Sequence, residues 1–168
     1  MKSITWGLNY EVYVLLQQVR DGLIGVRNKA LRKYKTSTKR VAVLFIIEAL
    51  DGKGIPAEIA RWLTRKPHSV STILQRMEKQ GLVKKSRDLE KRNQVRISMT
   101  EEGKQLYNQA LDIGEINQVM SVLSEEELCQ LRPILLKLRK KAFDELGIGE
   151  PPWYPVEPRD FGGSMFHS

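Results

Sequence analysis

Apolar residues in the first part of the chain recur at intervals of three and four positions, which is the period of an amphipathic helix. This pattern begins at Leu8 and continues through Leu31. It predicts one long helix over about residues 8–34. The polar segment that follows interrupts the pattern and offers Ser37 as an N-cap for a second helix over about 38–50.

A turn with two glycines follows, and Ile55 leaves room for no more than a single strand-pairing residue. Pro56 suits the first turn of a third helix, which we expect to reach about Thr64. A fourth helix is predicted over about 69–80, with Gly81 at the position that favours a left-handed C-terminal conformation. The apolar stripe of this fourth helix consists of Val70, Ile73, Leu74 and Met77.

The period then changes from helical to alternating, which indicates two short strands. Leu82 and Val83 begin the first strand, and the second contains Val95, Ile97 and Met99 alternating with polar residues. The segment between them, residues 86–93, is rich in charge, so we expect a β-hairpin with a cationic loop.

Two further helices are predicted after the hairpin, over about 100–123 with a bend at Gly114 and from Ser124 to about Leu146. Ser124 followed by Glu127 forms a capping-box sequence. Pro133 predicts a kink or a broken hydrogen bond inside the last helix. These elements together predict a mainly α fold with about six helices and a wing of two or three strands.

The charge of the chain is concentrated in one part of the sequence. The net charge is +8 overall, yet residues 65–96 alone carry +7, residues 1–64 carry +6, and residues 97–168 carry −5. The basic stretch coincides with the fourth helix and the hairpin, so its charge favours a surface that meets a polyanion. A cationic face retained only for solubility is the alternative, and the motif must decide between the two.

Other classes of function find little support in the residues. One cysteine and two histidines provide neither an internal disulfide nor a multi-thiolate metal site. We expect no enzyme, metal or cofactor, because the sequence has no glycine-rich phosphate loop and no Ser/His/Asp set. With no long apolar run and no secretory signal pattern at the start, we expect a cytoplasmic protein without membrane contact.

Residues 55–99 are predicted to follow the order helix, turn, helix, strand, charged loop, strand. This is the order of a winged helix-turn-helix unit. A helix held in the major groove needs one apolar face against the body of the protein and one polar, basic face toward the bases and phosphates. A wing needs cations near its tip to meet phosphate or the minor groove. The predicted recognition-helix contacts are Ser69, Ser71, Thr72, Gln75, Arg76 and Lys79. The predicted wing contacts are Arg87, Lys91, Arg92, Asn93 and Arg96. Around the start of the second helix, where its amides suit phosphate, we add Ser37, Lys39 and Arg40.

The run from Ser69 to Val83, the wing with Asp88 and Lys91-Arg92-Asn93, and Thr100-Glu101-Glu102-Gly103 after it resemble the multiple-antibiotic-resistance regulator (MarR) family. The resemblance covers about residues 8–147. It implies a homodimer with interlocked terminal helices and two winged domains that bind an inverted-repeat operator in double-stranded DNA. Many relatives carry a wing-tip arginine where this sequence has Asn93, so either Arg92 or its neighbour is the candidate for the minor groove.

The resemblance also implies a small aromatic or phenolic effector between the dimerisation helices and the winged domain. The candidate lining residues are Tyr10, Tyr13, Trp62 and Tyr107. The alternative, that these are aromatic residues of the core or of an interface, is the more economical interpretation. Redox sensing at Cys129 is disfavoured, because Glu125, Glu126 and Glu127 precede it and an acidic setting opposes the thiolate.

We therefore expect a sequence-specific DNA-binding regulator, with repression by blocking promoter access as the favoured mode. The alternative is a winged-helix module that uses its basic face for RNA or for an acidic protein. The expected division of the chain is an N-terminal dimerisation helix (1–34), a winged domain (35–100), C-terminal dimerisation helices (101–147) and a Pro/Gly/aromatic tail (148–168).

Overall fold

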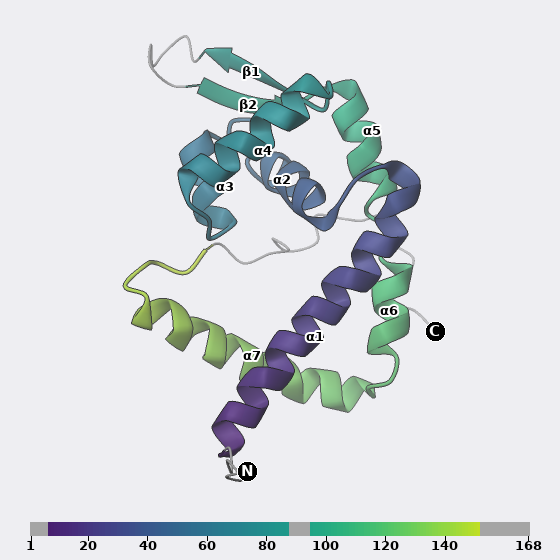
Figure 1. The fold of residues 1–168 in the computed structure, drawn as a ribbon, viewed down its shortest axis with the longest axis vertical. Coiled ribbons are helices and arrows are strands. Elements are labelled where there is room, and N and C mark those ends of the chain that lie inside the picture. Colours follow the sequence, from purple (N-terminus) through teal and green to yellow (C-terminus); the bar gives the residue numbers. More distant parts are fainter. Residues whose placement is uncertain (1–6, 88–94, 152–168) are drawn as a thin grey trace, which may run out of the picture.

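The structure is a computed structural model, and it describes residues 7–87 and 95–151. Figure 1 shows a winged unit at one end of a long first helix, with the C-terminal helices beside and across that helix. The helices and strands are α1 (Leu8–Leu31), the short 3-10 helix η1 (Arg32–Tyr34), α2 (Thr38–Ala49), α3 (Pro56–Trp62), α4 (Pro67–Lys79), β1 (Val83–Arg87), β2 (Val95–Met99), α5 (Glu101–Gln109), α6 (Gly114–Met120) and α7 (Glu125–Glu145). This order confirms the mainly helical winged fold expected from the sequence.

The hydrophobic core lies in the winged unit, between α2, α3, α4, α5 and the two-stranded sheet. Fully buried side chains come from α2, α3 and α4 and from both strands. Examples are Leu44, Ile59, Leu74, Val83 and Ile97. The core therefore fixes α4 against the sheet, which is what gives α4 a defined outer face.

β1 and β2 pair antiparallel from Val83 opposite Met99 to Arg87 opposite Val95. The only other bridge in the described part of the chain joins Gly54 to Ile97, whose amide donates to the Gly54 carbonyl at 2.9 Å. The expected single pairing residue was placed at Ile55, one position too late. Ile55 is instead the N-cap of α3, and the residue before it, Gly54, makes the bridge.

Three expected helix boundaries were wrong. α4 begins at Pro67 rather than at Ser69, because proline fits the first helical position, where no amide donor is needed. α3 ends at Trp62 rather than at Thr64, whose φ of 51° lies in the left-handed region. The first helix ends at Leu31, and its expected last turn is the 3-10 helix that Lys35 closes with a φ of 53°.

The predicted helix over 100–123 is two helices, α5 and α6, separated at residues 110–113. Gly114 begins the second of them rather than bending one continuous helix, and the Asp112 side chain accepts a hydrogen bond from its amide at 2.9 Å. This break raises the number of α-helices in the described ranges to seven, against about six expected.

The predicted caps have different outcomes. Ser124 and Glu127 form the complete capping box at the start of α7, as expected, and Pro133 lies inside that helix. Ser37 is the N-cap residue of α2, but its side chain makes no capping bond. Asn28 of α1 supplies the cap instead, because its Oδ1 accepts from both the amide and the hydroxyl of Thr38 at 2.9 Å.

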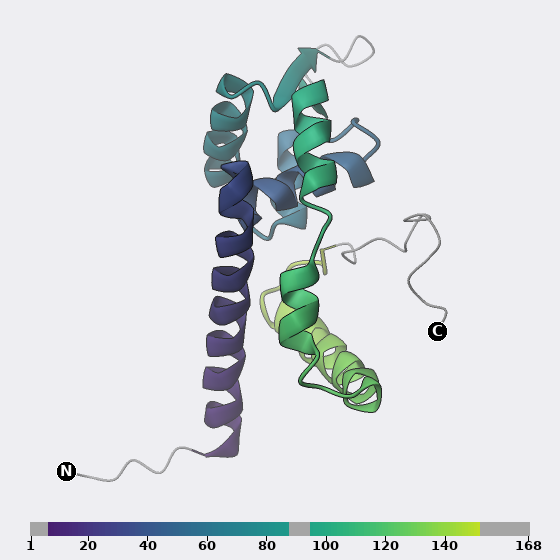
Figure 2. The same ribbon diagram turned by 90° about the vertical axis from the view of Figure 1, so that its right-hand side faces the viewer.

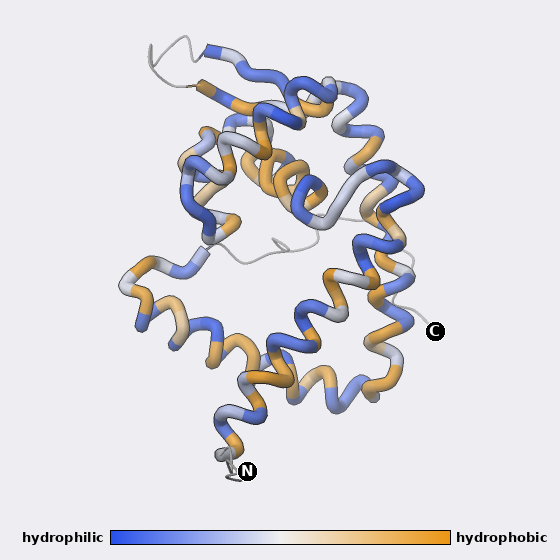
Figure 3. Tube along the Cα trace, in the orientation of Figure 1, coloured by the Kyte–Doolittle hydropathy of each residue, from blue (hydrophilic) through white to orange (hydrophobic). Residues whose placement is uncertain are grey.

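Outside the winged unit, the helices leave much apolar surface uncovered. α6 packs along α1, as both views indicate (Figures 1 and 2), whereas no residue of α7 is buried. Figure 3 shows apolar positions running along both α1 and α7. The exposed large apolar residues of these two helices include Leu8, Val12, Leu15, Leu16, Val19, Leu128, Leu131, Ile134, Leu135 and Leu138. Across the two described ranges, no helix is long and apolar enough to span a membrane.

Candidate nucleic-acid interface

α4 has one face in the core and one face in solvent. Val70, Leu74 and Met77 are at most 1% exposed. On the opposite side, four of the predicted contacts are exposed, namely Ser69, Gln75, Arg76 and Lys79. The other two, Ser71 and Thr72, are half-buried, and the Thr72 hydroxyl donates to the carbonyl of His68 at 3.2 Å. The helix therefore presents short hydroxyl side chains near its start and long polar or cationic ones toward its end.

The C-terminal end of α4 is closed by a glycine turn. Gly81 has a φ of 71°, its amide donates to the Glu78 carbonyl at 2.9 Å, and the Leu82 amide donates to the Met77 carbonyl at 2.9 Å. This pair of bonds is a Schellman motif, which satisfies carbonyls that the helix end would otherwise leave free. The turn leads directly into β1, so it sets the angle between α4 and the wing.

The base of the wing is tied to the same turn. The Thr100 amide donates to the Leu82 carbonyl at 3.1 Å, and the Thr100 hydroxyl donates to the Gly81 carbonyl and accepts from the Gly103 amide. A Cβ built on Gly103 would lie 2.0 Å from the Leu82 carbonyl oxygen, so only glycine allows this approach. The Thr-x-x-Gly pattern thus joins the start of α5 to the end of α4.

The described part of the wing carries two of the predicted cations. Arg87 is the exposed last residue of β1, and Arg96 on β2 is half-buried. Lys91, Arg92 and Asn93 lie outside the described residues. Minor-groove contact by Arg92 or its neighbour remains a prediction.

The acidic residue of α4 is paired with a lysine of the wing. Glu78, the acidic residue of α4, forms an ion pair with Lys85 of β1, with Nζ and Oε2 2.6 Å apart. Sequence reasoning missed this pair, because the seven-residue separation crosses a helix end and matches no helical spacing. Exposed cations of α4, of the turn before it and of β1 carry the positive charge of this region, namely Arg65, Lys66, Arg76, Lys79, Lys84 and Arg87.

The start of α2 is a weaker candidate for phosphate contact. Lys39 is exposed, Arg40 is half-buried and donates to the Lys35 carbonyl at 3.1 Å, and Ser37 is half-buried. Because Asn28 already accepts from the Thr38 amide, one of the donors that a phosphate would use is taken. Contact with DNA at Ser37, Lys39 and Arg40 remains a prediction.

The four aromatic residues proposed to line an effector site occupy different settings. Tyr10 and Tyr13 are 45% and 54% exposed on α1, with ring centroids 5.9 Å apart. Tyr107 is buried in the core, where its ring meets that of Phe45 at 6.2 Å, and Trp62 packs partly against the same core. The indole N–H of Trp62 is buried and has no acceptor within the described residues.

A helix-turn-helix whose second helix presents a basic face, followed by a two-stranded hairpin, defines a winged helix-turn-helix unit. This architecture places its second helix in the major groove. Comparison with known families agrees, because residues 37–103 match the family described as winged helix DNA-binding domain.

Similar proteins extend this match beyond the winged unit. A solved organohalide-sensing transcriptional regulator, in its 2,4-dichlorophenol-bound form, is 31% identical over 94% of each chain with a TM-score of 0.84. The organic hydroperoxide resistance transcriptional regulator of Bacillus subtilis is 39% identical over 42% of this chain, and the match spans 48% of that regulator. The transcriptional repressor MdtR of the same organism is 29% identical over 60% of this chain and 68% of its own length. A MarR-family regulator from Rhodococcus sp. RHA1, 21% identical with a TM-score of 0.70 over 83% of this chain and 99% of its own, shares the fold. The chain belongs with the winged helix transcriptional regulators, and it has the fold that MarR-family regulators share.

Proposed function

We propose that this protein is a transcriptional repressor that binds an inverted-repeat operator as a homodimer. The observation that carries the proposal is the two-faced α4, with three core residues on one side and Gln75, Arg76 and Lys79 exposed on the other. Glutamine and arginine are the side chains that read adenine and guanine edges in the major groove. In this proposal the protein acts by binding DNA rather than by catalysis, and it acts in the cytoplasm.

The unburied apolar stripes support a homodimer. A helix of 21 residues with no buried residue, such as α7, gains little stability alone, because most helical stability in proteins comes from packing an apolar face. Covering Leu131, Leu135 and Leu138 of α7 together with the stripe of α1 by a second copy supplies that packing. Dimerisation also places two recognition helices on one duplex, as an inverted repeat requires. In this proposal, residues 1–34 and 101–147 contribute the dimerisation helices and residues 35–100 form the DNA-binding domain, with α5 packed against the winged core.

The first experiment selects bound fragments from random duplex DNA and then measures affinity by fluorescence anisotropy. We expect an inverted repeat to emerge and to bind at least about 10³-fold more tightly than a scrambled duplex of the same composition. The logarithm of affinity should fall linearly and steeply with the logarithm of salt concentration, because phosphate contacts release counterions. Equal affinity for the scrambled duplex would contradict the regulator proposal. Preference for RNA, or for an acidic protein, would favour the alternative use of the same basic face.

Two variants distinguish side chains that recognise bases from side chains that contact phosphates. Arg76→Ala should relax base preference at one position of each half-site, at about 1–3 kcal/mol of discrimination. Arg92→Ala should weaken binding to all sequences and lower the salt slope by about one. Lys137→Ala, on the exposed surface of α7 far along the chain from the winged unit, is the matched control and should change neither. The opposite pattern would mean that the two arginines have exchanged roles.

We also propose that a phenolic effector releases the operator. The unpartnered indole N–H of Trp62 supports a polar ligand group beside α3, because buried donors in native proteins nearly always have an acceptor. The similarity to a regulator solved with 2,4-dichlorophenol supports the ligand class. Titration with 2,4-dichlorophenol should release the labelled operator, and Trp62→Phe should weaken this effect while Lys137→Ala leaves it unchanged. If 2,4-dichlorophenol still fully releases the operator from the Trp62→Phe variant, Trp62 is not part of the effector site.

A further inference from the structure

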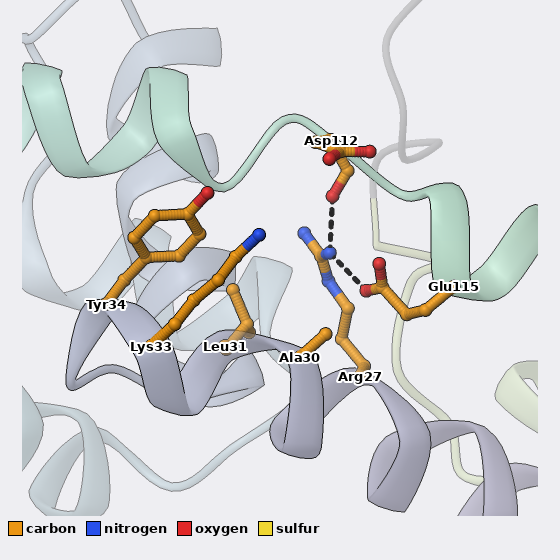
Figure 4. A pocket seen from close by; sticks show the side chains of 7 residues that line it. All are labelled: Arg27, Ala30, Leu31, Lys33, Tyr34, Asp112 and Glu115. Carbon is orange, nitrogen blue, oxygen red and sulfur yellow. Dashed lines mark hydrogen bonds and ion pairs between the residues drawn. The ribbon is translucent and has the colours of Figure 1, made fainter.

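The side chain of Arg27 joins the two regions of the fold. Arg27 lies in α1, yet its side chain donates to groups more than 80 residues later, between the end of α5 and the first turn of α6. Figure 4 shows its guanidinium extending from α1 into the junction, between the backbone at Asp112 and the carboxylate of Glu115. Nη1 donates to the Asp112 carbonyl at 2.6 Å and to Glu115 Oε1, and Nη2 donates to the Ala110 carbonyl.

These partners occupy the segment that connects the winged unit to the dimerisation helices. α5 belongs to the winged core through Leu106 and Tyr107, whereas α6 packs on α1. Residues 110–113, which are not helical, are therefore one of two covalent connections between the regions, and the other is the segment from η1 to the start of α2. Arg27 therefore binds the first connection, residues 110–113, from α1, which is the helix that leads into the second connection.

Burial makes this contact unlike the surface ion pairs of the chain. The side chains of Arg27 and Glu115 are 11% and 20% exposed, whereas those of Arg20 and Asp21 on the same helix are 65% and 66% exposed. A guanidinium with several acceptors in a partly buried site holds its geometry, because its planar fork matches fixed oxygen positions. The exposed Arg20 pair has neither property.

From this arrangement we infer that Arg27 is a positioning residue that sets the angle between the winged unit and the dimerisation helices. In a homodimer, that angle fixes the separation of the two copies of α4 and hence the half-site spacing that the dimer accepts. The inference rests on the proposed DNA-binding function. It assigns spacing selectivity to a residue that is remote from the DNA-binding face of α4.

The test varies the spacer between the half-sites selected by the unaltered protein, by one and two base pairs in each direction. The unaltered protein should bind one spacer best and discriminate sharply against the others. Arg27→Met removes every donor and keeps an unbranched, similarly long side chain. It should preserve the half-site sequence preference and reduce spacer discrimination by at least about tenfold, since a loose connection lets the two recognition helices meet several spacings. Arg20→Met is the matched control and should retain the full discrimination.

A second readout needs no DNA. A spin label at Gln80→Cys, in a Cys129→Ser background, reports the distance between the two recognition helices of the dimer. The distance distribution should be narrow for the unaltered Arg27 and broader for Arg27→Met. If Arg27→Met does not fold, Glu115→Gln tests the role of Arg27 instead, because it keeps the side-chain shape and removes one charge of the pair. It should flatten the spacer profile and broaden the distances in the same direction.

The outcomes separate the two proposals. An unaltered protein that does not prefer its selected repeat over scrambled DNA contradicts the regulator function itself. A selective protein whose folded Arg27→Met and Glu115→Gln variants keep the unaltered spacer profile and distance distribution overturns the role of Arg27 alone.

Discussion

Replacing Gly103 with alanine tests whether the base of the wing is held by close backbone packing. Gly103 lies in the first turn of α5, and its missing side chain allows the Leu82 carbonyl oxygen to approach. An alanine Cβ would lie 2.0 Å from this oxygen and 3.0 Å from the Leu82 carbonyl carbon. Both neighbours are backbone atoms, so no side-chain rotation can relieve the contact.

The magnitude follows from three contributions. Forced overpacking costs about 1–3 kcal/mol when backbone must move. The required movement is more than about 1 Å, since ordinary contacts between heavy atoms begin near 3.5 Å, and it disturbs the two bonds from Thr100 to Leu82 and Gly81, at about 0.5–1.5 kcal/mol each. Alanine returns about 1 kcal/mol through its higher helix propensity. These contributions sum to an expected net loss of about 1–5 kcal/mol for each chain.

Urea unfolding of the full chain, followed by far-UV circular dichroism, measures this loss by linear extrapolation. All variants are compared at one protein concentration, because the stability of a dimer depends on it. Gly25→Ala is the matched control. Gly25 is also helical, but a Cβ there meets nothing within 4 Å, so alanine should stabilise the chain by about 0.5–1 kcal/mol. If Gly103→Ala stabilises the protein as much as Gly25→Ala does, the close approach does not constrain the fold and the reasoning is wrong.

Three further predictions concern the caps, the dimer and the core. Ser124→Ala removes the capping box of α7 and should lower the unfolding free energy by about 0.5–2 kcal/mol in the same assay, whereas a change below the error would show that this helix end is held otherwise. Leu138→Glu places a charge in the exposed apolar stripe of α7 and should convert the dimer to monomer at micromolar concentration in sedimentation velocity, with Lys137→Glu beside it as the control. Burial, with a smaller contribution from Glu48, raises the pKa of Tyr107, so the native state keeps this proton to higher pH than the unfolded chain does. The stabilisation is present below the ordinary tyrosine pKa and is lost as pH rises through the raised value, and Tyr107→Phe should make the alkaline fall in unfolding free energy shallower.

The sequence predicted the elements of the winged unit because their signals are local. The apolar stripe of α4, the glycine that ends it and the alternation in β2 depend on neighbouring residues, and the structure confirms each of them. The predicted capping box at Ser124 is confirmed for the same reason.

The errors arose where a contact distant in sequence decides the local structure. Ser37 has the residue type and position of a capping side chain, but Asn28, ten positions earlier, occupies the Thr38 amide. The chain between α5 and α6 has helix-forming residues, but its carbonyls at Ala110 and Asp112 accept from Arg27 instead of continuing a helix. No spacing rule connects residues separated by more than 80 positions, so the contacts of Arg27 could not be predicted from the sequence, although Gly114 marked where the helix is interrupted.

The cap that Asn28 provides has a consequence for how the protein unfolds. Leu31, at the end of the same helix, is 1% exposed, so the last turns of α1 supply both a buried side chain and a helix cap next to the winged unit. A fragment that starts at α2 would lose both and expose an uncapped helix end. The end of α1 and the start of α2 should therefore exchange their amide hydrogens with the same protection, as one cooperative unit, while the N-terminal turns of α1, which do not contact the winged unit, exchange with a protection of their own. The winged unit is then a folding unit that extends into the long helix rather than a module that begins after it.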